Sequence, residues 1–301
     1  MKKIIIITFC ISLIQSCSNV DKITDIADTT GSLNLIGGTN EMTINQTIDG
    51  NSVPRVVYIK TPQNLDSSLS YPIVFFFHGA GGSGQNFLQN NNITELINSE
   101  EFIGIFPNGH SNNGGNGGFW NLGSEPTTAN DVEYVDLIID QLATSTLIDI
   151  SKAYAVGFSN GSGMVNLLGK STSHFNAIAP LFSQQISSTG DLTPNKAMSV
   201  FQVNGDVDGL IPLNGGVSSV GTFMSAQHSA LNWATHFNCN STATQEDLNW
   251  GNTVLSSFTY SNCDNSHEIK CLIALNTGHG FTDAQTEQVA YTQIWEFFKQ
   301  Y

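Results

Sequence analysis

Residues 153–168 read AYAVGFSNGSGMVNLL, and this stretch decides the fold. The apolar run over residues 153–156 is typical of a short buried strand, and the residues from 163 onward begin a helix. Between the two, Gly157-Phe158-Ser159-Asn160-Gly161 matches the pattern Gly-x-Ser-x-Gly. In a strand–turn–helix setting this pattern forms a strained turn that exposes the serine hydroxyl. We therefore expect Ser159 to be a nucleophile; the alternative is a glycine-rich turn with a capping serine.

Strands and helices alternate on both sides of this turn. Residues 73–77 and 102–106 are uninterrupted apolar runs, as in strands that are covered on both faces. Residues 131–142 carry apolar side chains at the spacing of an amphipathic helix. Further strands are expected over residues 56–60, 198–203, 258–260 and 269–275, and further helices over residues 222–237 and 284–298. This alternation predicts one α/β domain, with a mainly parallel sheet, helices on both faces, and chemistry at the carboxyl ends of the strands.

The strand expected over residues 73–77 runs into a glycine-rich loop, His78-Gly79-Ala80-Gly81-Gly82. Backbone N–H groups in such a loop can stabilise an oxyanion next to a nucleophile. We expect the N–H groups of Ala80 and Asn160 to form an oxyanion hole, with Gly81 as the alternative to Ala80. His78 is expected to hold the loop by hydrogen bonds. The alternative for the whole segment is a plain turn.

A serine hydroxyl needs a base to take its proton and a third group to orient that base. His279 lies after the last expected strand, in the loop Gly278-His279-Gly280, and the other histidines that follow Ser159 have no such position. We therefore predict His279 as the base. The strand over residues 198–203 leads to Asp206 and Asp208, and both remain candidates for the acid at this point.

The N-terminus has the features of an export signal. Lys2 and Lys3 precede an apolar run over residues 4–14, which is too short to cross a membrane as a helix. Ile14-Gln15-Ser16-Cys17 resembles the lipobox of bacterial lipoproteins, although Gln15 fits it poorly. We expect a signal peptide over 1–16, a flexible tether over 17–40, and a catalytic domain over 41–301. Lipidation at Cys17 would anchor the protein at the bacterial cell envelope or outer surface; secretion is the alternative.

Composition limits the partners. The chain has 25 acidic and 10 basic residues, a net charge of -15, so we expect nucleic acid and anionic membrane surfaces to be poor partners. Cys239 and Cys263 lie in polar surroundings and form the better disulfide pair, whereas Cys271 lies in an apolar run and is expected to be a buried thiol. No spacing of His, Cys and carboxylate residues indicates a metal site, and no cofactor is expected.

Several short segments together resemble one family of secreted esterases with the α/β-hydrolase fold. It includes polyhydroxybutyrate depolymerase-like proteins and feruloyl and acetylxylan esterases. The resemblance covers most of residues 53–298. The matching segments are residues 55–62, 77–84, 106–109, 120–121, 131–142, 154–164, 204–216 and 278–279, together with Cys239 and Cys263. It implies hydrolysis of esters by a Ser-His-Asp triad through an acyl-enzyme.

The resemblance also bears on individual residues. The family's acid segment, His-Gly-x-x-Asp-x-x-Val-Pro, aligns with residues 204–212, and this alignment selects Asp208 over Asp206. Asn204 stands in place of the family's histidine. After the base the family has Trp-Pro, where this chain has Phe281-Thr282, and we expect Phe281 to fill the aromatic position beside the substrate. The pair Cys239–Cys263 also looks like the family disulfide.

The substrate is less well specified. Residues 112–120 form a Gly- and Asn-rich loop that ends in Trp120. This side chain either stacks on a sugar or aromatic acyl group, or is buried under the loop. We see no separate polymer-binding domain, so we rank feruloyl or acetyl esters of polysaccharide fragments above a polyhydroxyalkanoate polyester. A serine peptidase and a non-catalytic glycan-binding lipoprotein are more remote alternatives.

Overall fold

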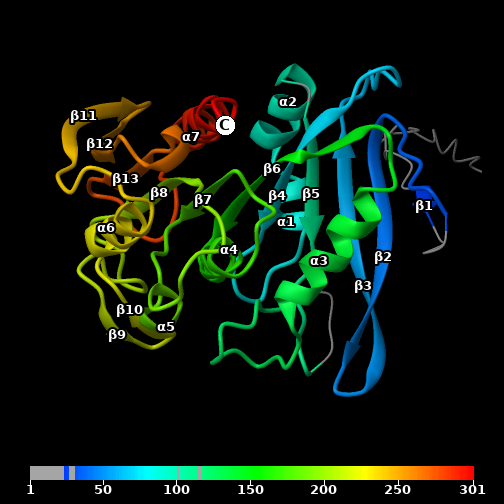
Figure 1. The fold of residues 1–301 in the computed structure, drawn as a ribbon, viewed down its shortest axis with the longest axis horizontal. Coiled ribbons are helices and arrows are strands. Elements are labelled where there is room, and N and C mark those ends of the chain that lie inside the picture. Colours follow the sequence, from blue (N-terminus) through cyan, green and yellow to red (C-terminus); the bar gives the residue numbers. More distant parts are fainter. Residues whose placement is uncertain (1–23, 27–30, 101, 114–116) are drawn as a thin grey trace, which may run out of the picture.

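The turn that carries Ser159 follows a strand in the interior of an eleven-stranded sheet. The computed structural model describes residues 24–26, 31–100, 102–113 and 117–301. The strands of the large sheet are β1 (Thr24–Ile26), β2 (Gly38–Ile48), β3 (Asn51–Thr61), β4 (Tyr71–Phe77), β5 (Ile103–Pro107), β6 (Ile148–Phe158), β7 (Ala177–Leu181), β8 (Ser199–Gly205), β11 (Thr244–Trp250), β12 (Thr253–Tyr260) and β13 (Ile269–Ala274). Their order is β1-β2-β3-β5-β4-β6-β7-β8-β13-β12-β11 (Figure 1).

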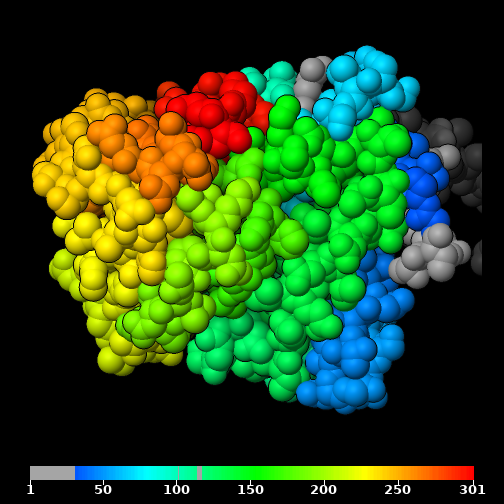
Figure 2. Space-filling view, viewed as in Figure 1, coloured from blue at the N-terminus to red at the C-terminus, as the bar shows by residue number. Residues whose placement is uncertain are grey.

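The strands around the turn that carries Ser159 are parallel. Strands β5, β4, β6, β7, β8 and β13 pair in parallel, whereas β3 joins β5, and β12 joins β13, in antiparallel fashion. The first and last strands of the sheet lie at its opposite edges, so the yellow and orange residues are at one end of the molecule in Figure 2 and the blue residues at the other. The carboxyl ends of β4, β6, β8 and β13 therefore share one edge of the sheet.

Helices cover both faces of the sheet. They are α1 (Gln85–Leu88), α2 (Asn91–Glu100), α3 (Asp131–Leu142), α4 (Asn160–Ser171), α5 (Ser187–Gly190), α6 (Ala226–His236) and α7 (Ala284–Phe298), with a 3-10 turn η1 (Asp264–Ser266). Ile73, Phe75 and Phe77 of β4 pack into a core with α3, α4 and α6. Val74 and Phe76 of the same strand pack into a second core with α1, α2 and α7. The predicted mainly parallel sheet with helices on both faces is thereby confirmed.

One predicted helix begins later than expected. The prediction was a helix over residues 222–237, but a small hairpin of β9 (Gly216–Ser218) and β10 (Gly221–Phe223) occupies its first residues. Helix α6 begins after Ser225, whose hydroxyl accepts a hydrogen bond from the His228 N–H at 3.2 Å. This N-cap interaction defines the start of the helix, and apolar periodicity alone did not reveal it.

The folded chain also begins earlier than predicted. Leu33 and Leu35 fall within the expected tether over 17–40, yet both are buried in the core, and β2 begins at Gly38. The Leu33 N–H donates to Thr144 Oγ1 at 2.9 Å, which fastens this segment beside α3. Burial of two leucines outweighs the polar composition that favoured a tether. The predicted signal peptide and Cys17 lie outside the described residues. Within the described ranges, no helix is long and apolar enough to cross a membrane.

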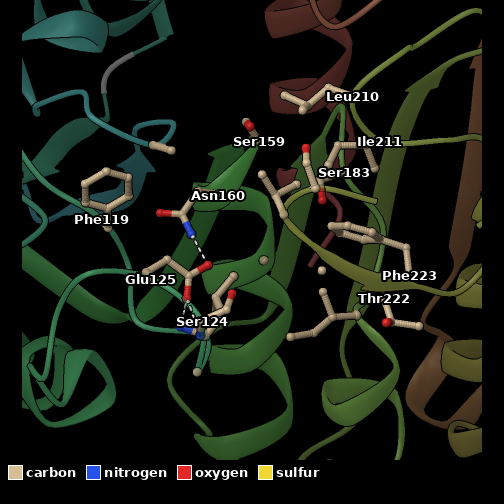
Figure 3. A pocket seen from close by; sticks show the side chains of 18 of the residues that line it. Phe119, Ser124, Glu125, Ser159, Asn160, Ser183, Leu210, Ile211, Thr222 and Phe223 are labelled. Carbon is tan, nitrogen blue, oxygen red and sulfur yellow. Dashed lines mark hydrogen bonds between the residues drawn. The ribbon is translucent and has the colours of Figure 1, made fainter. Parts of the chain in front are cut away.

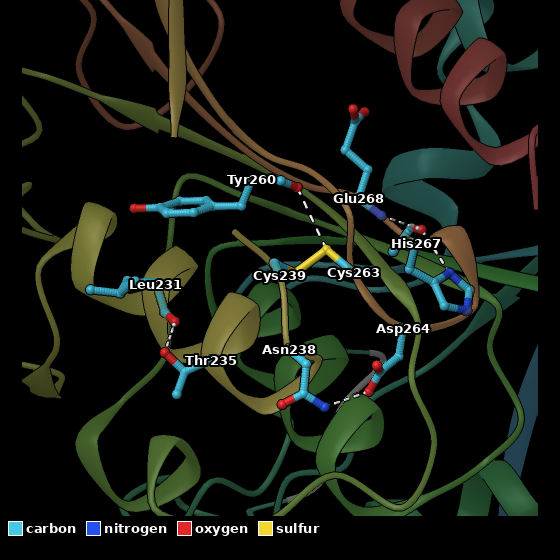
Figure 4. The surroundings of a disulfide bond; sticks show 10 residues. Leu231, Thr235, Asn238, Cys239, Tyr260, Cys263, Asp264, His267 and Glu268 are labelled. Atoms are coloured by element: carbon cyan, nitrogen blue, oxygen red, sulfur yellow. Dashed lines mark hydrogen bonds between the residues drawn. A yellow bond between two sulfur atoms is a disulfide. The ribbon is translucent and has the colours of Figure 1, made fainter. Parts of the chain in front are cut away.

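Cys239 and Cys263 form the predicted disulfide, which closes a segment of 24 residues (Figure 4). Cys239 follows α6 and Cys263 follows β12. The surrounding backbone is joined as well, because the Asp264 N–H donates to Phe237 O at 2.8 Å. The disulfide therefore connects helix α6 to the antiparallel end of the sheet.

The Cys271 thiol is free and buried, and its burial raises its pKa to about 12.

Removing this disulfide is expected to destabilise the domain. A cross-link over a loop of this length restricts the unfolded chain and contributes about 3 kcal/mol. Cys239→Ala/Cys263→Ala should lower the free energy of unfolding by about that amount, measured by urea denaturation. Reductant should destabilise the wild type similarly and leave the double variant unchanged, because Cys271 would then be the last cysteine among the described residues. A double variant as stable as the wild type would contradict the assignment.

Candidate active site

The turn after β6 holds Ser159 in a strained backbone conformation, with φ 55° and ψ -117°. Two glycines make this turn sterically feasible. A Cβ atom on Gly157 would lie 2.1 Å from the Gly161 carbonyl oxygen, and one on Gly161 would lie 2.0 Å from the Phe77 carbonyl oxygen. Only glycine fits at these two positions. Helix α4 can therefore begin against the end of β4.

The pairing of β8 with β13 brings the two following loops together. Gly205 pairs with Ala274, and a Cβ atom on Gly205 would lie 2.2 Å from the Thr277 carbonyl oxygen. Asp206 accepts a hydrogen bond from the Thr277 N–H at 3.2 Å, so this carboxylate joins the loops through their backbone. Asp208, two residues further on, contacts His279 instead.

Ser159, His279 and Asp208 form one chain of hydrogen bonds. Ser159 Oγ lies 2.8 Å from His279 Nε2, and His279 Nδ1 lies 2.7 Å from Asp208 Oδ2. A carboxylate only accepts hydrogen bonds, so Nδ1 carries the proton of the neutral ring and Nε2 is left to accept from the serine. Asp208 Oδ1 accepts from the backbone N–H groups of Leu210 and Ile211 at 2.8 and 3.0 Å. These bonds orient the carboxylate toward the ring.

Aromatic rings support His279 on its other side. Phe158 and Phe182 lie with their ring centroids 5.4 and 6.5 Å from that of His279. Phe281 packs edge-on against Phe182 at 4.9 Å and also contacts Tyr291 at 6.1 Å. Ser159 lies at a pocket that is described below. Phe281 does not line this pocket, although we predicted that it lies beside the substrate. Its contact with Phe182 places it against the second core, where it is partly buried.

The two predicted oxyanion donors flank Ser159. The Asn160 N–H belongs to the first residue of α4, so it has no acceptor within the helix. The Gly81 N–H donates to the Gly118 carbonyl oxygen at 2.9 Å, whereas none of the described groups accepts a hydrogen bond from the Ala80 N–H. Ala80 and Asn160 both line the pocket. Between Ala80 and Gly81, the geometry therefore favours Ala80.

His78 holds the oxyanion loop from inside. Its side chain is buried, its Nδ1 lies 2.8 Å from Gly79 O, and its Nε2 accepts from the Gly109 N–H at 2.9 Å. These bonds need the neutral ring with the proton on Nδ1. Burial lowers the pKa of His78 to about 4, with a smaller effect from the Arg55 charge. The predicted structural role of His78 is confirmed.

Trp120 lies under this loop rather than in the pocket. It is fully buried, and its indole N–H donates to His78 O at 2.8 Å. Of the two alternatives for Trp120, the structure supports a tryptophan packed under the loop and not a contact with substrate. The ring packs against Phe77 at 5.0 Å between centroids, which leaves Phe119 as the aromatic residue of this loop that lines the pocket.

A buried ion pair anchors the segment that carries Trp120. Arg55 Nη1 lies 2.8 Å from Asp131 Oδ1, and the guanidinium lies 3.5 Å over the Tyr134 ring. Asp131 Oδ2 accepts from the Asn121 N–H at 2.7 Å. Sequence reasoning assigned neither charged residue a role, because the two are far apart in the chain. Their position fixes the loop to the start of α3.

Asn204 connects to the acid loop through buried amides. Its Nδ2 donates to Gln184 Oε1 at 2.9 Å, and Gln202 Nε2 donates to its Oδ1 at 2.7 Å. Gln184 Nε2 in turn donates to the carbonyl oxygens of Pro212 and Met224 at 2.9 and 2.8 Å. The departure from the family's histidine is thus accommodated by a hydrogen-bonded network that supports the segment after Asp208.

Ser159 opens into a pocket of about 880 Å³. Figure 3 places Phe119, Asn160 and Glu125 on one side of it and Ser183 and Phe223 on the other. The lining residues are Ala80, Phe119, Leu122, Gly123, Ser124, Glu125, Pro126, Ser159, Asn160, Gly163, Ser183, Ile186, Ser187, Ser188, Leu210, Ile211, Ser219, Val220, Gly221, Thr222 and Phe223. Most of the wall is apolar or hydroxyl-bearing. Within the described ranges, no cluster of His, Cys, Asp or Glu could hold a metal ion.

The chain is similar in sequence to feruloyl esterases. It is 26% identical over 256 residues to feruloyl esterase B of Piromyces equi, an alignment that covers 82% of this chain and 45% of that protein. It is 27% identical over 252 residues to feruloyl esterase C of Emericella nidulans, which covers 81% of this chain and 83% of that protein. The chain thus spans about half the length of the first relative and most of the second. No family model matches it.

Solved structures show the same fold. The acetyl xylan esterase from Aspergillus awamori superposes with a TM-score of 0.60 at 17% identity, over 87% of this chain and 99% of that one. Esterase 2 of Thermogutta terrifontis superposes with a TM-score of 0.55 at 12% identity, over 86% of this chain and 92% of that one. The fold is that of the α/β-hydrolases. The similarity in sequence to feruloyl esterases and this fold agree with the resemblance to α/β-hydrolase esterases that the motifs predicted.

The buried, neutral His78 predicts a specific loss of stability in acid. Its pKa is about 4 in the folded state and near 6.5 when unfolded, so the unfolded chain binds the proton first as the pH falls. The free energy of unfolding should therefore decrease between about pH 6.5 and 4. Between pH 7 and pH 5, protonation of His78 should lower the free energy of unfolding by about 2 kcal/mol.

Urea denaturation at pH 7 and pH 5 measures this effect. In His78→Gln, the decrease in the free energy of unfolding between pH 7 and pH 5 should be about 2 kcal/mol smaller than in the wild type. This holds whatever the stability of the variant at pH 7. His228→Gln is the matched control, since His228 is exposed on α6, and it should keep the wild-type dependence. Equal pH dependence in His78→Gln and the wild type would show that His78 is not the group that titrates.

Proposed function

We propose that this chain is a carboxylic ester hydrolase in which Ser159, His279 and Asp208 act as a catalytic triad. The observation that carries the proposal is the hydrogen-bonded chain of these three side chains, with Ser159 on a strained turn beside a large pocket. The geometry joins a nucleophile to its base and the base to a buried carboxylate. The similarity to feruloyl esterases supports ester substrates.

The reaction proceeds by acyl transfer. His279 Nε2 takes the Ser159 proton as Oγ attacks the ester carbonyl carbon, and the N–H groups of Ala80 and Asn160 bind the oxyanion. His279 then gives the proton to the leaving alcohol, which leaves the acyl group on Ser159. Water attacks this acyl-enzyme, His279 takes one of its protons and returns it to Ser159, and the acid is released. Asp208 stabilises the charged imidazole in both steps.

The substrate is an ester with a bulky acyl group, of the feruloyl type, on a polysaccharide fragment. An acetyl group would fill only a small part of a pocket of about 880 Å³, and Phe119 offers an aromatic surface within it. Side-by-side hydrolysis of methyl ferulate, acetylated xylan and polyhydroxybutyrate film tests this choice. Methyl ferulate should be the fastest of the three, and clearance of the film alone would favour a polyester depolymerase instead.

We also place the protein outside the cytoplasm. The basic and apolar residues at the N-terminus fit an export signal, and the Cys239–Cys263 disulfide suits an oxidising compartment. Acylation at Cys17 would then tether the catalytic domain to the cell envelope.

The nucleophile assignment has a direct test. Ser159→Ala should reduce kcat on p-nitrophenyl acetate by about 10⁴-fold or more and abolish labelling by a fluorophosphonate probe. His279→Ala should give a comparable loss, and Asp208→Asn a loss of about 10⁴-fold, because it disturbs the tautomer of the base. Ser52→Ala is the control: this serine is exposed on β3, and its replacement should leave labelling intact. A folded Ser159→Ala protein that still hydrolyses the ester would refute the proposal.

A further inference from the structure

The pocket wall carries one formally charged side chain. Among the described lining residues, Glu125 alone is acidic, and none is Lys or Arg. Figure 3 shows Glu125 directed toward Asn160, the residue that follows Ser159. The remaining wall consists of apolar groups such as Phe223 and Ile186 and of hydroxyl groups such as that of Ser183. Among the described lining residues, a single carboxylate therefore carries the formal charge.

This carboxylate is held in place entirely by N–H donors. Its Oε1 accepts from Asn160 Nδ2 at 3.1 Å, and its Oε2 accepts from the backbone N–H groups of Leu122 and Ser124 at 2.8 and 3.1 Å (Figure 3). Neutral N–H donors suit the ionised carboxylate but do not cancel its charge. No described Lys, Arg or His forms an ion pair with it. A net negative charge therefore remains at the wall.

The same contacts hold this charge in the pocket that Ser159 also lines. Asn160 Oδ1 accepts from the Trp120 N–H at 2.7 Å, and its Nδ2 donates to Trp120 O at 3.0 Å, so its side chain has a fixed orientation. Glu125 accepts a hydrogen bond from this fixed amide, and Asn160 itself directly follows Ser159 in the chain. An ester whose acyl group occupies this pocket thus shares a partly enclosed space with the carboxylate, where like charges repel more strongly than in bulk water.

We infer that Glu125 is a specificity-determining residue that makes this pocket select neutral esters and reject esters whose acyl group carries a negative charge. This inference rests on the proposed ester hydrolase function. The favoured occupant is an uncharged acyl group that combines an apolar body with hydroxyl groups, because the wall offers apolar surface and serine hydroxyls. Specificity here comes from repulsion of the wrong substrate as well as from contacts to the right one.

Two esters matched in size test the inference. Methyl 4-carboxycinnamate is an anion at neutral pH, and methyl 4-carbamoylcinnamate is its neutral isostere. For the wild type, kcat/KM should be at least about tenfold higher for the neutral ester at low salt, and this ratio should shrink as salt screens the charge. A wild-type ratio near one would overturn the inference.

In Glu125→Gln, the ratio of kcat/KM for the neutral ester to kcat/KM for the anionic ester should be close to one. Any disturbance of Asn160 or of the oxyanion donors affects both esters alike, so the ratio isolates the charge. Glu246→Gln is the matched control: it removes one acidic charge at an exposed position of β11 and should keep the wild-type ratio. A Glu125→Gln protein with an unchanged ratio would also overturn the inference.

A binding measurement separates this inference from the proposed function. Ser159→Ala retains the pocket, so calorimetry should find the neutral ester bound about tenfold more tightly than the anion, without any turnover. Loss of this preference in Ser159→Ala/Glu125→Gln would support the role of Glu125. If the wild type hydrolyses neither ester while Ser159→Ala keeps the preference, the proposed chemistry fails and the charge selectivity stands. Equal affinity for the two esters would contradict the selectivity itself.

Discussion

The close contact between the start of helix α4 and the end of strand β4 is the constraint on which the rest of the site depends. No side chain fits at Gly161, because a Cβ atom would meet the Phe77 carbonyl oxygen, and none fits at Gly157. The turn between them must therefore be tight, and Ser159 takes up a positive φ. The same contact sets the N–H of Asn160 opposite the loop that carries Ala80. One steric requirement thus positions the proposed nucleophile and both proposed oxyanion donors.

The base and the acid depend on a second close approach, between the loops that follow β8 and β13. Gly205 allows the two backbones to meet, and Asp206 joins them by a hydrogen bond. Asp208 then faces His279, which is supported by Phe158 and Phe182. A side chain that seems redundant in the sequence, Asp206, therefore has a distinct structural role. Preorganisation of this kind is what gives a triad its catalytic effect.

The pocket beside these groups has a negatively charged wall, unlike a site that binds anions. Its wall carries the Glu125 carboxylate, and the chain as a whole has a net charge of -15. Hydrolysis of an ester produces an acid that is ionised at neutral pH. The charge that disfavours anionic esters would therefore also favour release of the product. Charge selectivity and product release would then follow from the same carboxylate, while the oxyanion donors act only on the atoms at Ser159.

The sequence by itself determined the central strands, the turn at Ser159, the strand-end position of His279 and the better cysteine pair, because apolar runs, glycine pairs and chain order reflect local sterics and burial. It left the acid open between Asp206 and Asp208 until the family resemblance was applied. Only the tertiary structure decided that Trp120 is buried, that Phe281 packs against the second core and that Glu125 borders the pocket. The reason is physical: which side chains meet, and which face solvent, depends on contacts between segments far apart in the chain, and no local pattern encodes them.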